Sequence, residues 1–352
     1  MADEELDSND KIEIEKVQEV EGKERSILAE PSLLLQLGSA LLPSNYMNLS
    51  PRWQGWFVRG QSGILLMSCF YTLVSLGPPG LFCLTCMVQL ASFYEVMQLG
   101  YSVTKVEGMN TWCWLLFCVA NLQYLDPSVA KLLPISPSQK TALCYILYTF
   151  LMVWFVLSIR KTSQCLTRYC LLAWTHMAIL FLTVQAYLMN LTLQHGMVWY
   201  IFSMSIITIN DIAAYMFGFF CGSTPLIVLS PKKTVEGYVG GGLVTILLGP
   251  AYGYYLQQFP YLTCPTINLS VTSCDPEVLP HSSLFIIHYA AISLFASTVG
   301  PVAGFFCSGF KRACNRKNFG SLIPGHGGVL DRCDCMFLMA TFTYMYLNTI
   351  VM

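Results

Sequence analysis

Residues that could bind phosphate and metal are concentrated in one stretch of the chain, residues 308–334. It contains cations, two acids and a glycine turn: Ser308, Lys311, Arg312, Lys317, His326, Gly327, Gly328, Asp331 and Asp334. Asp331 and Asp334 are three residues apart, a spacing that puts two carboxylates on one face of a helix. Paired hard oxygens suit Mg²⁺, which takes one or two carboxylates and fills its other positions with water and substrate phosphate. The cations can neutralise phosphate oxygens, and the glycines let backbone amides approach an anion. Together these groups indicate phosphoryl or nucleotidyl transfer.

A purely structural interpretation accounts for part of this stretch. Lys and Arg on a cytoplasmic loop would contact lipid headgroups, and Asp331 at the start of a helix would cap it. That interpretation leaves the Pro-Gly-His-Gly-Gly turn over 324–328 and the two acids that follow it unexplained. We therefore favour a phosphate site in which Asp331 and Asp334 are the predicted metal ligands.

The elements that must position these residues are membrane-spanning helices. The chain has 352 residues, of which 55% are hydrophobic and 11% charged, whereas a soluble domain carries about 25% charged residues. A spanning helix needs roughly 20 apolar residues. Nine segments come near that length and predict an all-α, polytopic integral membrane protein: 61–77, 79–97, 111–125, 141–159, 169–191, 197–221, 238–257, 284–307 and 335–352. The net charge of −1 gives no overall field that would attract nucleic acid, so no such partner is expected.

The distribution of Lys and Arg predicts how these spans are oriented. Cations favour the cytoplasmic side of a membrane. They follow the fourth, sixth and eighth segments, whereas the connections after the fifth and seventh contain none. Loops 222–237 and 308–334 are then cytoplasmic and loop 258–283 is lumenal, with the third loop a mild exception. Residues 1–47 are expected to form a charged, disordered cytoplasmic tail before a transmembrane domain over 48–352.

Two sequence blocks resemble the signature of the phosphatidate cytidylyltransferases, also called CDP-diacylglycerol synthases. The first block is Ser308-x-x-Lys311-Arg312-x(4)-Lys317, followed by Pro324-Gly325-His326-Gly327-Gly328-x-x-Asp331-Arg332-x-Asp334. The second is Asn210-Asp211-x-x-Ala214-Tyr215-x-x-Gly218, then Thr224-Pro225-Leu226, then Ser230-Pro231-Lys232-Lys233-Thr234-x-Glu236-Gly237. The run from Asn48 to Gly60 is similar to the animal members, so the resemblance covers residues 48–352.

The resemblance implies an enzyme that transfers CMP from CTP to phosphatidic acid, giving CDP-diacylglycerol and pyrophosphate in phospholipid synthesis. It implies Mg²⁺ as the cofactor, with CTP, phosphatidic acid and membrane lipid as partners. The catalytic residues would be Ser308, Lys311, Arg312, Lys317, His326, Asp331 and Asp334, and the substrate-binding residues Asp211, Ser230, Lys232, Lys233, Gly327 and Gly328. The start of the chain is not an Arg-rich amphipathic segment, which favours the endoplasmic reticulum membrane. Homo-oligomerisation is left open.

Four positions near the expected site depart from the family pattern. Asn318 stands where the family has Asp, Ser223 where relatives carry a basic residue, and Val235 where Trp is usual. Gly304 stands where bacterial members, unlike animal members, place another acid. These changes permit a second hypothesis, a catalytically weak or inactive paralogue that binds lipid phosphate or scaffolds lipid enzymes. A third hypothesis, a transporter, is disfavoured because transporter sites lie near the bilayer midplane, whereas the polar residues here gather in two loops on one side.

Two further acids lie inside apolar segments. An intramembrane acid is costly and usually faces a cavity or a partner, which favours a functional role for Asp211. The alternative is an acid at the cytoplasmic end of its helix. For Glu95, an interfacial acid is as compatible with the sequence as a functional one.

Overall fold

The computed structural model describes residues 51–106, 108–231, 233–266, 285–323 and 327–351, with side chains from Gly60 onward. The chain divides into two compact units, Met1–Leu65 and Leu66–Met352. The described part of the first unit is the beginning of helix α3 (Pro51–Ser75). The predicted tail over 1–47 lies outside the described residues. All further description concerns the second unit.

Within the described residues, each predicted span overlaps one helix or a run of consecutive helices. After α3 the chain forms α4 (Pro78–Thr104), α5 (Asn110–Gln123), α6 (Pro127–Ala130), α7 (Pro137–Ser158), η2 (Thr162–Gln164), α8 (Cys165–Ile179), η3 (Leu180–Val184), α9 (Gln185–Thr192), η4 (Leu193–His195), α10 (Met197–Cys221), α11 (Val235–Gln257), α12 (Pro260–Thr263), α13 (Phe285–Thr298), α14 (Gly300–Ala313), α15 (Leu330–Tyr346) and η5 (Leu347–Val351). Apart from two isolated bridges, regular structure in these ranges is helical. The all-α class is therefore confirmed.

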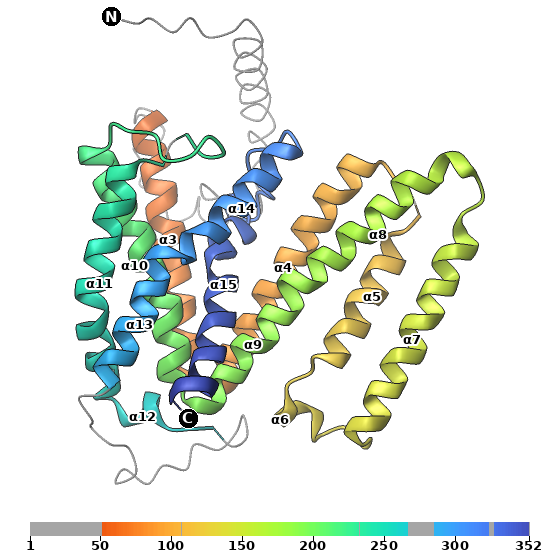
Figure 1. Ribbon diagram of the computed structural model, residues 1–352, viewed down its shortest axis with the longest axis horizontal. Coiled ribbons are helices and arrows are strands. Elements are labelled where there is room, and N and C mark those ends of the chain that lie inside the picture. Colours follow the sequence, from red (N-terminus) through yellow and green to blue (C-terminus); the bar gives the residue numbers. More distant parts are fainter. Residues whose placement is uncertain (1–50, 107, 232, 267–284, 324–326, 352) are drawn as a thin grey trace, which may run out of the picture. The chain divides into compact units, whose positions relative to one another are not determined.

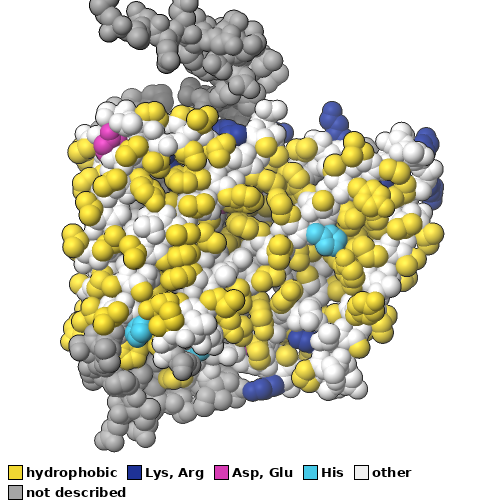
Figure 2. Space-filling view, in the orientation of Figure 1, with side chains coloured by type: hydrophobic (Ala, Val, Ile, Leu, Met, Phe, Trp, Pro, Cys, Tyr) yellow, Lys and Arg dark blue, Asp and Glu magenta, His cyan; other side chains and the backbone are white. Residues whose placement is uncertain are grey.

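Among the described residues, six helices are long and apolar enough to cross a bilayer. They are α4, α7, the segment Thr162–His195, α10, α11 and the segment Phe285–Ala313. Figure 2 shows hydrophobic side chains across the middle of the face in view, with Lys and Arg toward its upper and lower edges. These features confirm a polytopic membrane protein, and the count of nine spans stays a prediction.

The loops of the second unit gather at two ends (Figure 1). The α7–α8, α10–α11 and α14–α15 connections lie at the upper end in that view, whereas α6, α12 and the C-terminus lie at the lower end. Both signature blocks therefore approach one end of the helices, as the predicted orientation requires. Helix α12, which belongs to the predicted lumenal loop, lies at the other end.

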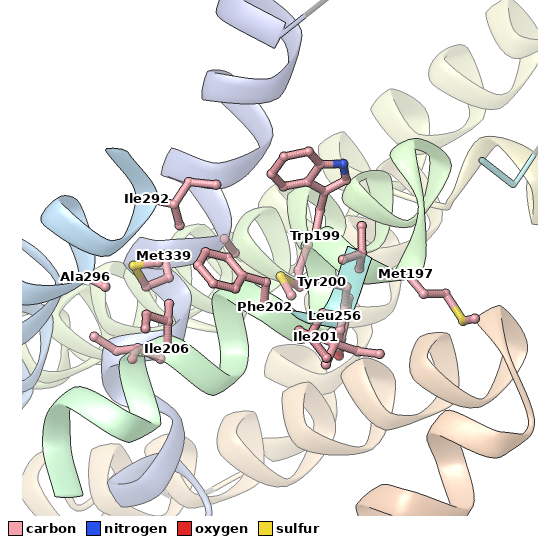
Figure 3. Close-up of a cluster of buried hydrophobic side chains, with 14 of the residues drawn as sticks. Met197, Trp199, Tyr200, Ile201, Phe202, Ile206, Leu256, Ile292, Ala296 and Met339 are labelled. Carbon is pink, nitrogen blue, oxygen red and sulfur yellow. The ribbon is translucent and has the colours of Figure 1, made fainter. Parts of the chain in front are cut away.

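Helix α10 is the central packing element, in contact with α11, α13 and α15. Figure 3 shows its Phe202 and Ile206 beside Ile292 and Ala296 of α13 and Met339 of α15. In a bilayer the apolar tails of lipids compete for such surfaces, so close van der Waals contact rather than removal from water holds the helices together. The result is a fixed relation between α10, which carries Asp211, and α15, which carries Asp334.

A break at Val299 separates α13 from α14. Pro301 has no N–H to donate, so it occupies the first turn of the new helix. Figure 1 shows α14 leaving the line of α13, which directs its last turns toward α15. Helix α14 continues to Ala313, so Ser308, Lys311 and Arg312 lie on a helix rather than in the predicted loop 308–334. The basic residues extend the helix because both long cations are good helix formers and suit a helix C-terminus.

Candidate active site

An ion pair between Lys311 and Asp331 joins α14 to α15. Lys311 Nζ lies 2.6 Å from Asp331 Oδ1, and the two side chains are only 12% and 6% exposed. Asp331 Oδ2 accepts hydrogen bonds from the backbone N–H groups of Phe319 and Gly328, each at 3.0 Å. Lys311 Nζ also lies 5.2 Å from the centroid of the Phe319 ring. Protein donors thus occupy both oxygens of Asp331, which ties the α14–α15 loop to the two helices.

Glu95 of α4 caps the start of α15. Its side chain is 2% exposed. Oε1 accepts from Val329 N at 2.9 Å and Oε2 from Leu330 N at 3.0 Å. A carboxylate at a helix N-terminus satisfies amides that have no partner within the helix and complements the helix dipole. Gly328 leaves room for it, because a Cβ there would lie 2.5 Å from Glu95 Oε2. The structure therefore assigns Glu95 to positioning α15, beside Asp331, which accepts from Gly328 N.

Three charged groups from separate elements converge beside this region. Asp211 of α10, Lys233 of the α10–α11 loop and Asp334 of α15 lie within Coulombic range of one another. Asp334 Oδ1 accepts from Cys335 N at 2.9 Å. The Asp211 side chain is exposed in the protein alone and that of Asp334 is half-buried. Lys233 attracts both acids, Lys311 also attracts Asp334, and Arg332 also attracts Asp211, while the two acids repel each other.

Gly304 of α14 provides the space in which these groups meet. A Cβ at this position would lie 3.6 Å from Asp334 Oδ2, 3.7 Å from Lys233 Nζ and 2.9 Å from Cys335 Sγ. Any side chain here would crowd Cys335 and fill the gap between the acid and the cation. The glycine at 304 is therefore suited to this arrangement of charges.

The donors around Asp211 and Asp334 fit a Mg²⁺ ion. Within the described ranges, no three His, Cys, Asp or Glu side chains come together as metal ligands. Mg²⁺ does not need three, because it binds through one or two carboxylates and takes its other oxygens from water and phosphate. Asp334 lies within Coulombic range of Asp211, whereas both oxygens of Asp331, its predicted companion, are engaged with Lys311 and backbone amides.

The α10–α11 loop is held closed by Glu236 in the first turn of α11. Its carboxylate accepts from Ser223 N and Oγ at 3.2 and 2.9 Å, and from Thr224 N and Oγ at 3.1 and 2.8 Å. Ser223, a departure from the family pattern, therefore donates hydrogen bonds to Glu236. Leu226 N donates to Lys233 O at 2.8 Å across the loop. These contacts fix the backbone from which Lys233 reaches α14, where its Nζ lies 4.8 Å from the centroid of the Phe305 ring.

The other predicted site residues have different surroundings. Ser308 is half-buried on α14, Arg312 is exposed, Lys317 is half-buried, and Ser230 is half-buried in a turn of the α10–α11 loop. The N–H of Gly327, at φ +87°, donates to Ile323 O at 3.0 Å, and that of Gly328 donates to Asp331. Both glycine amides are therefore hydrogen-bonded to acceptors within the protein. Lys232 and His326 lie outside the described residues.

Comparisons with known proteins agree with the sequence blocks and the geometry. The chain matches the model of the cytidylyltransferase family over residues 57–350, a range that includes both blocks. It is 35% identical over 349 residues to phosphatidate cytidylyltransferase 1 of Mus musculus, covering 88% of this chain and 76% of that protein. It is 35% identical over 342 residues to phosphatidate cytidylyltransferase 2 of Homo sapiens, covering 86% and 77%. With the phosphatidate cytidylyltransferase of Caenorhabditis elegans it shares 34% identity over 342 residues, covering 86% and 73%.

Proposed function

Because the chain belongs to the cytidylyltransferase family, we propose that it transfers CMP from CTP to phosphatidic acid and releases pyrophosphate. The product is CDP-diacylglycerol. Both the acceptor and the product are lipids, which suits a site built among membrane helices. The observation that carries the proposal is the convergence of Asp211, Lys233 and Asp334 from three separate elements.

The reaction is a substitution at the α-phosphorus of CTP. A phosphate oxygen of phosphatidic acid forms a bond to that phosphorus, and the bond to the β-phosphate bridging oxygen breaks, so pyrophosphate leaves with the electron pair. The nucleophile is already an anion, so no strong general base is required. The main obstacle is bringing two anions together, which preorganised cations overcome. Lys233, held by its closed loop, is placed to neutralise phosphate oxygens, while Asp331 fixes the neighbouring Lys311.

Asp211 and Asp334 are the residues that would hold Mg²⁺. An ion held there would neutralise negative charge on the substrate phosphates. Glu95 and Asp331 support this arrangement by fixing the first turn of α15, which directly precedes Asp334.

The endoplasmic reticulum membrane is the proposed location, with the signature loops on the cytoplasmic side. The Lys and Arg of the α7–α8, α10–α11 and α14–α15 connections support this orientation. Ser223 donates to Glu236 rather than leaving it without a partner, so this departure from the family pattern does not argue for an inactive paralogue.

The test compares matched amide variants of the purified full-length chain. Asp211→Asn and Asp334→Asn remove one carboxylate each and should lower CDP-diacylglycerol formation from CTP and phosphatidic acid by at least about 100-fold. Asp126→Asn is the control, because Asp126 caps α6 through Ser128 N at 2.8 Å and an amide oxygen can replace it. The control should retain activity. Native-like rates in Asp334→Asn at limiting Mg²⁺ would refute the assigned site.

A further inference from the structure

A cavity lies between α5, α7 and α8, at the upper end of these helices in Figure 1. Its volume is about 490 Å³, within the range of roughly 300–1,000 Å³ typical of small-molecule sites. It is lined by residues that include Trp112, Trp154, Leu157, Arg160, Lys161 and Arg168. It shares none of these residues with the candidate active site, so it must be explained separately.

The polar wall of this cavity is cationic. Arg160 and Lys161 are exposed on the α7–α8 connection, and Arg168 is half-buried on α8. Arg168 Nη1 donates to Ser158 O at 2.9 Å and to Ser158 Oγ at 2.7 Å, which fixes its guanidinium at the wall. None of the described lining residues is acidic. Guanidinium and ammonium groups in this arrangement select phosphate or carboxylate.

The other wall is apolar and continues onto the lipid-facing surface of α7. Leu157 is 75% exposed and Trp154 39% exposed, whereas Trp112 is buried and donates to Leu151 O at 2.8 Å. Trp side chains and cations at the end of an apolar helix mark the depth of the lipid headgroups. The cavity thus offers cations for a phosphate group and, directly beside them, an apolar surface for acyl chains.

We propose that this cavity binds the headgroup of an anionic glycerophospholipid, taken from the leaflet that faces the signature loops. The lipid is a resident ligand and not a substrate, because the cavity contains none of the acids or cations of the active site. A basic surface loop alone would attract anionic lipids loosely. Here the hollow between three helices and the fixed Arg168 provide a defined site. This proposal concerns binding and does not depend on the proposed enzyme activity.

The experiment measures lipid retention by the purified full-length chain, using native mass spectrometry. Dioleoyl phosphatidylglycerol is the anionic probe and dioleoyl phosphatidylcholine the zwitterionic one. Arg160→Gln/Lys161→Gln removes two exposed cations and leaves the Arg168–Ser158 contacts intact. The matched control, Lys105→Gln/Lys131→Gln, removes two exposed cations that do not line the cavity. Each cation near a membrane surface raises the affinity for anionic lipid about fivefold. Because the cavity variant lacks two such cations, its affinity for phosphatidylglycerol should fall about 30-fold.

Three outcomes would overturn the proposal. One is equal retention of phosphatidylglycerol by the native chain and the cavity variant. Another is equal retention of phosphatidylcholine and phosphatidylglycerol by the native chain. The third is displacement of the lipid by millimolar inorganic phosphate, which would assign the cavity to a free anion. A loss confined to the cavity variant, with the control unchanged, supports the proposal.

Discussion

Asp331 and Asp334 are three residues apart and perform different tasks. Asp331 receives Lys311 and two backbone amides, so it organises the loop between α14 and α15. Asp334 lies within Coulombic range of Asp211 and Lys233, so it belongs to the group of charges formed by these three residues. The spacing correctly predicts that both acids lie near the beginning of the same helix. It cannot indicate which external group each acid contacts, because three residues of a helix turn the second side chain partly away from the first.

Asn318 is the departure from the family pattern that lies beside Gly327, next to Asp331. It is exposed, and a Cβ at Gly327 would lie 3.4 Å from Asn318 Cγ and 3.3 Å from Asp331 Oδ2. We predict that Asn318→Asp raises kcat/KM for CTP about tenfold. A carboxylate holds a nearby cation more strongly than an amide, and about 1.4 kcal/mol of transition-state stabilisation corresponds to a factor of ten.

The control for this prediction is Asn315→Asp, which adds the same charge to an exposed position of the same loop. It should leave kcat/KM unchanged. If Asn318→Asp also leaves a readily measured rate unchanged, Asn318 does not limit catalysis and serves only as a turn residue.

Resemblance to the family signature predicted Asp211, Lys233 and Asp334 as site residues. It could not assign Glu95. Its partners are backbone amides, and the one at Leu330 lies 235 residues further along the chain. Every non-proline residue has a backbone N–H group, so the pattern of side chains does not indicate which backbone amide an acid will bind. The one available signal was an acid within an apolar helix, which usually has a partner.

At the scale of elements, the start of α15 depends on α4. We predict that Glu95→Gln lowers kcat and the melting temperature together. An amide can accept only through its oxygen, so one of the two capping bonds is lost, along with the charge that complements the helix dipole. Hydrogen bonds to charged groups contribute about 1.5–3 kcal/mol, which would correspond to at least a tenfold loss of rate if it falls on the positioning of Asp334.

Glu95→Asp separates positioning from folding. It keeps the charge and shortens the reach, so it should recover part of the melting temperature but little of kcat. Native kcat in Glu95→Gln, measured on protein that melts at the native temperature, would show that α15 does not need this cap.

Hydropathy predicted the helices well, because apolar length is the main constraint on a membrane helix. It did not predict where α14 ends. The last turns of α14 carry Lys311 and Arg312, whose charges suggest a loop, yet both residues remain helical to Ala313. Nor did it predict the break at Val299, since Gly300-Pro301 is compatible with either a kink or a fresh start.

At the scale of the molecule, the two ends of the helices differ in chemistry. Cys264, beside α12 at the lower end, is disulfide-bonded, whereas the other cysteines within the described ranges are free. Disulfides persist in oxidising compartments, which agrees with a lumenal lower end. We predict that Ser321→Cys, in the α14–α15 loop, reacts with an impermeant maleimide in sealed microsomes.

Ser138→Cys, in the first turn of α7 at the lower end, should react only after the membrane is opened. Ser321 is preferred to its neighbour Gly320, where a Cβ would lie 2.6 Å from Glu95 Oε1 and disturb the cap. Protection of position 321 in sealed vesicles, with position 138 labelled, would reverse the assigned orientation.

The long-range cap on α15 also has a consequence for how the protein is made. Ribosomes add roughly 5–20 residues per second, and Leu330 follows Glu95 by 235 positions. Glu95 therefore waits roughly 10–50 s in the nascent chain before the amides that satisfy it are synthesised. During that interval Glu95 is already part of the nascent chain, but the amides of Val329 and Leu330 that bind it in the folded protein have not been synthesised. Helix α4 therefore gains the partners that its acid has in the folded protein only when the start of α15 has been synthesised.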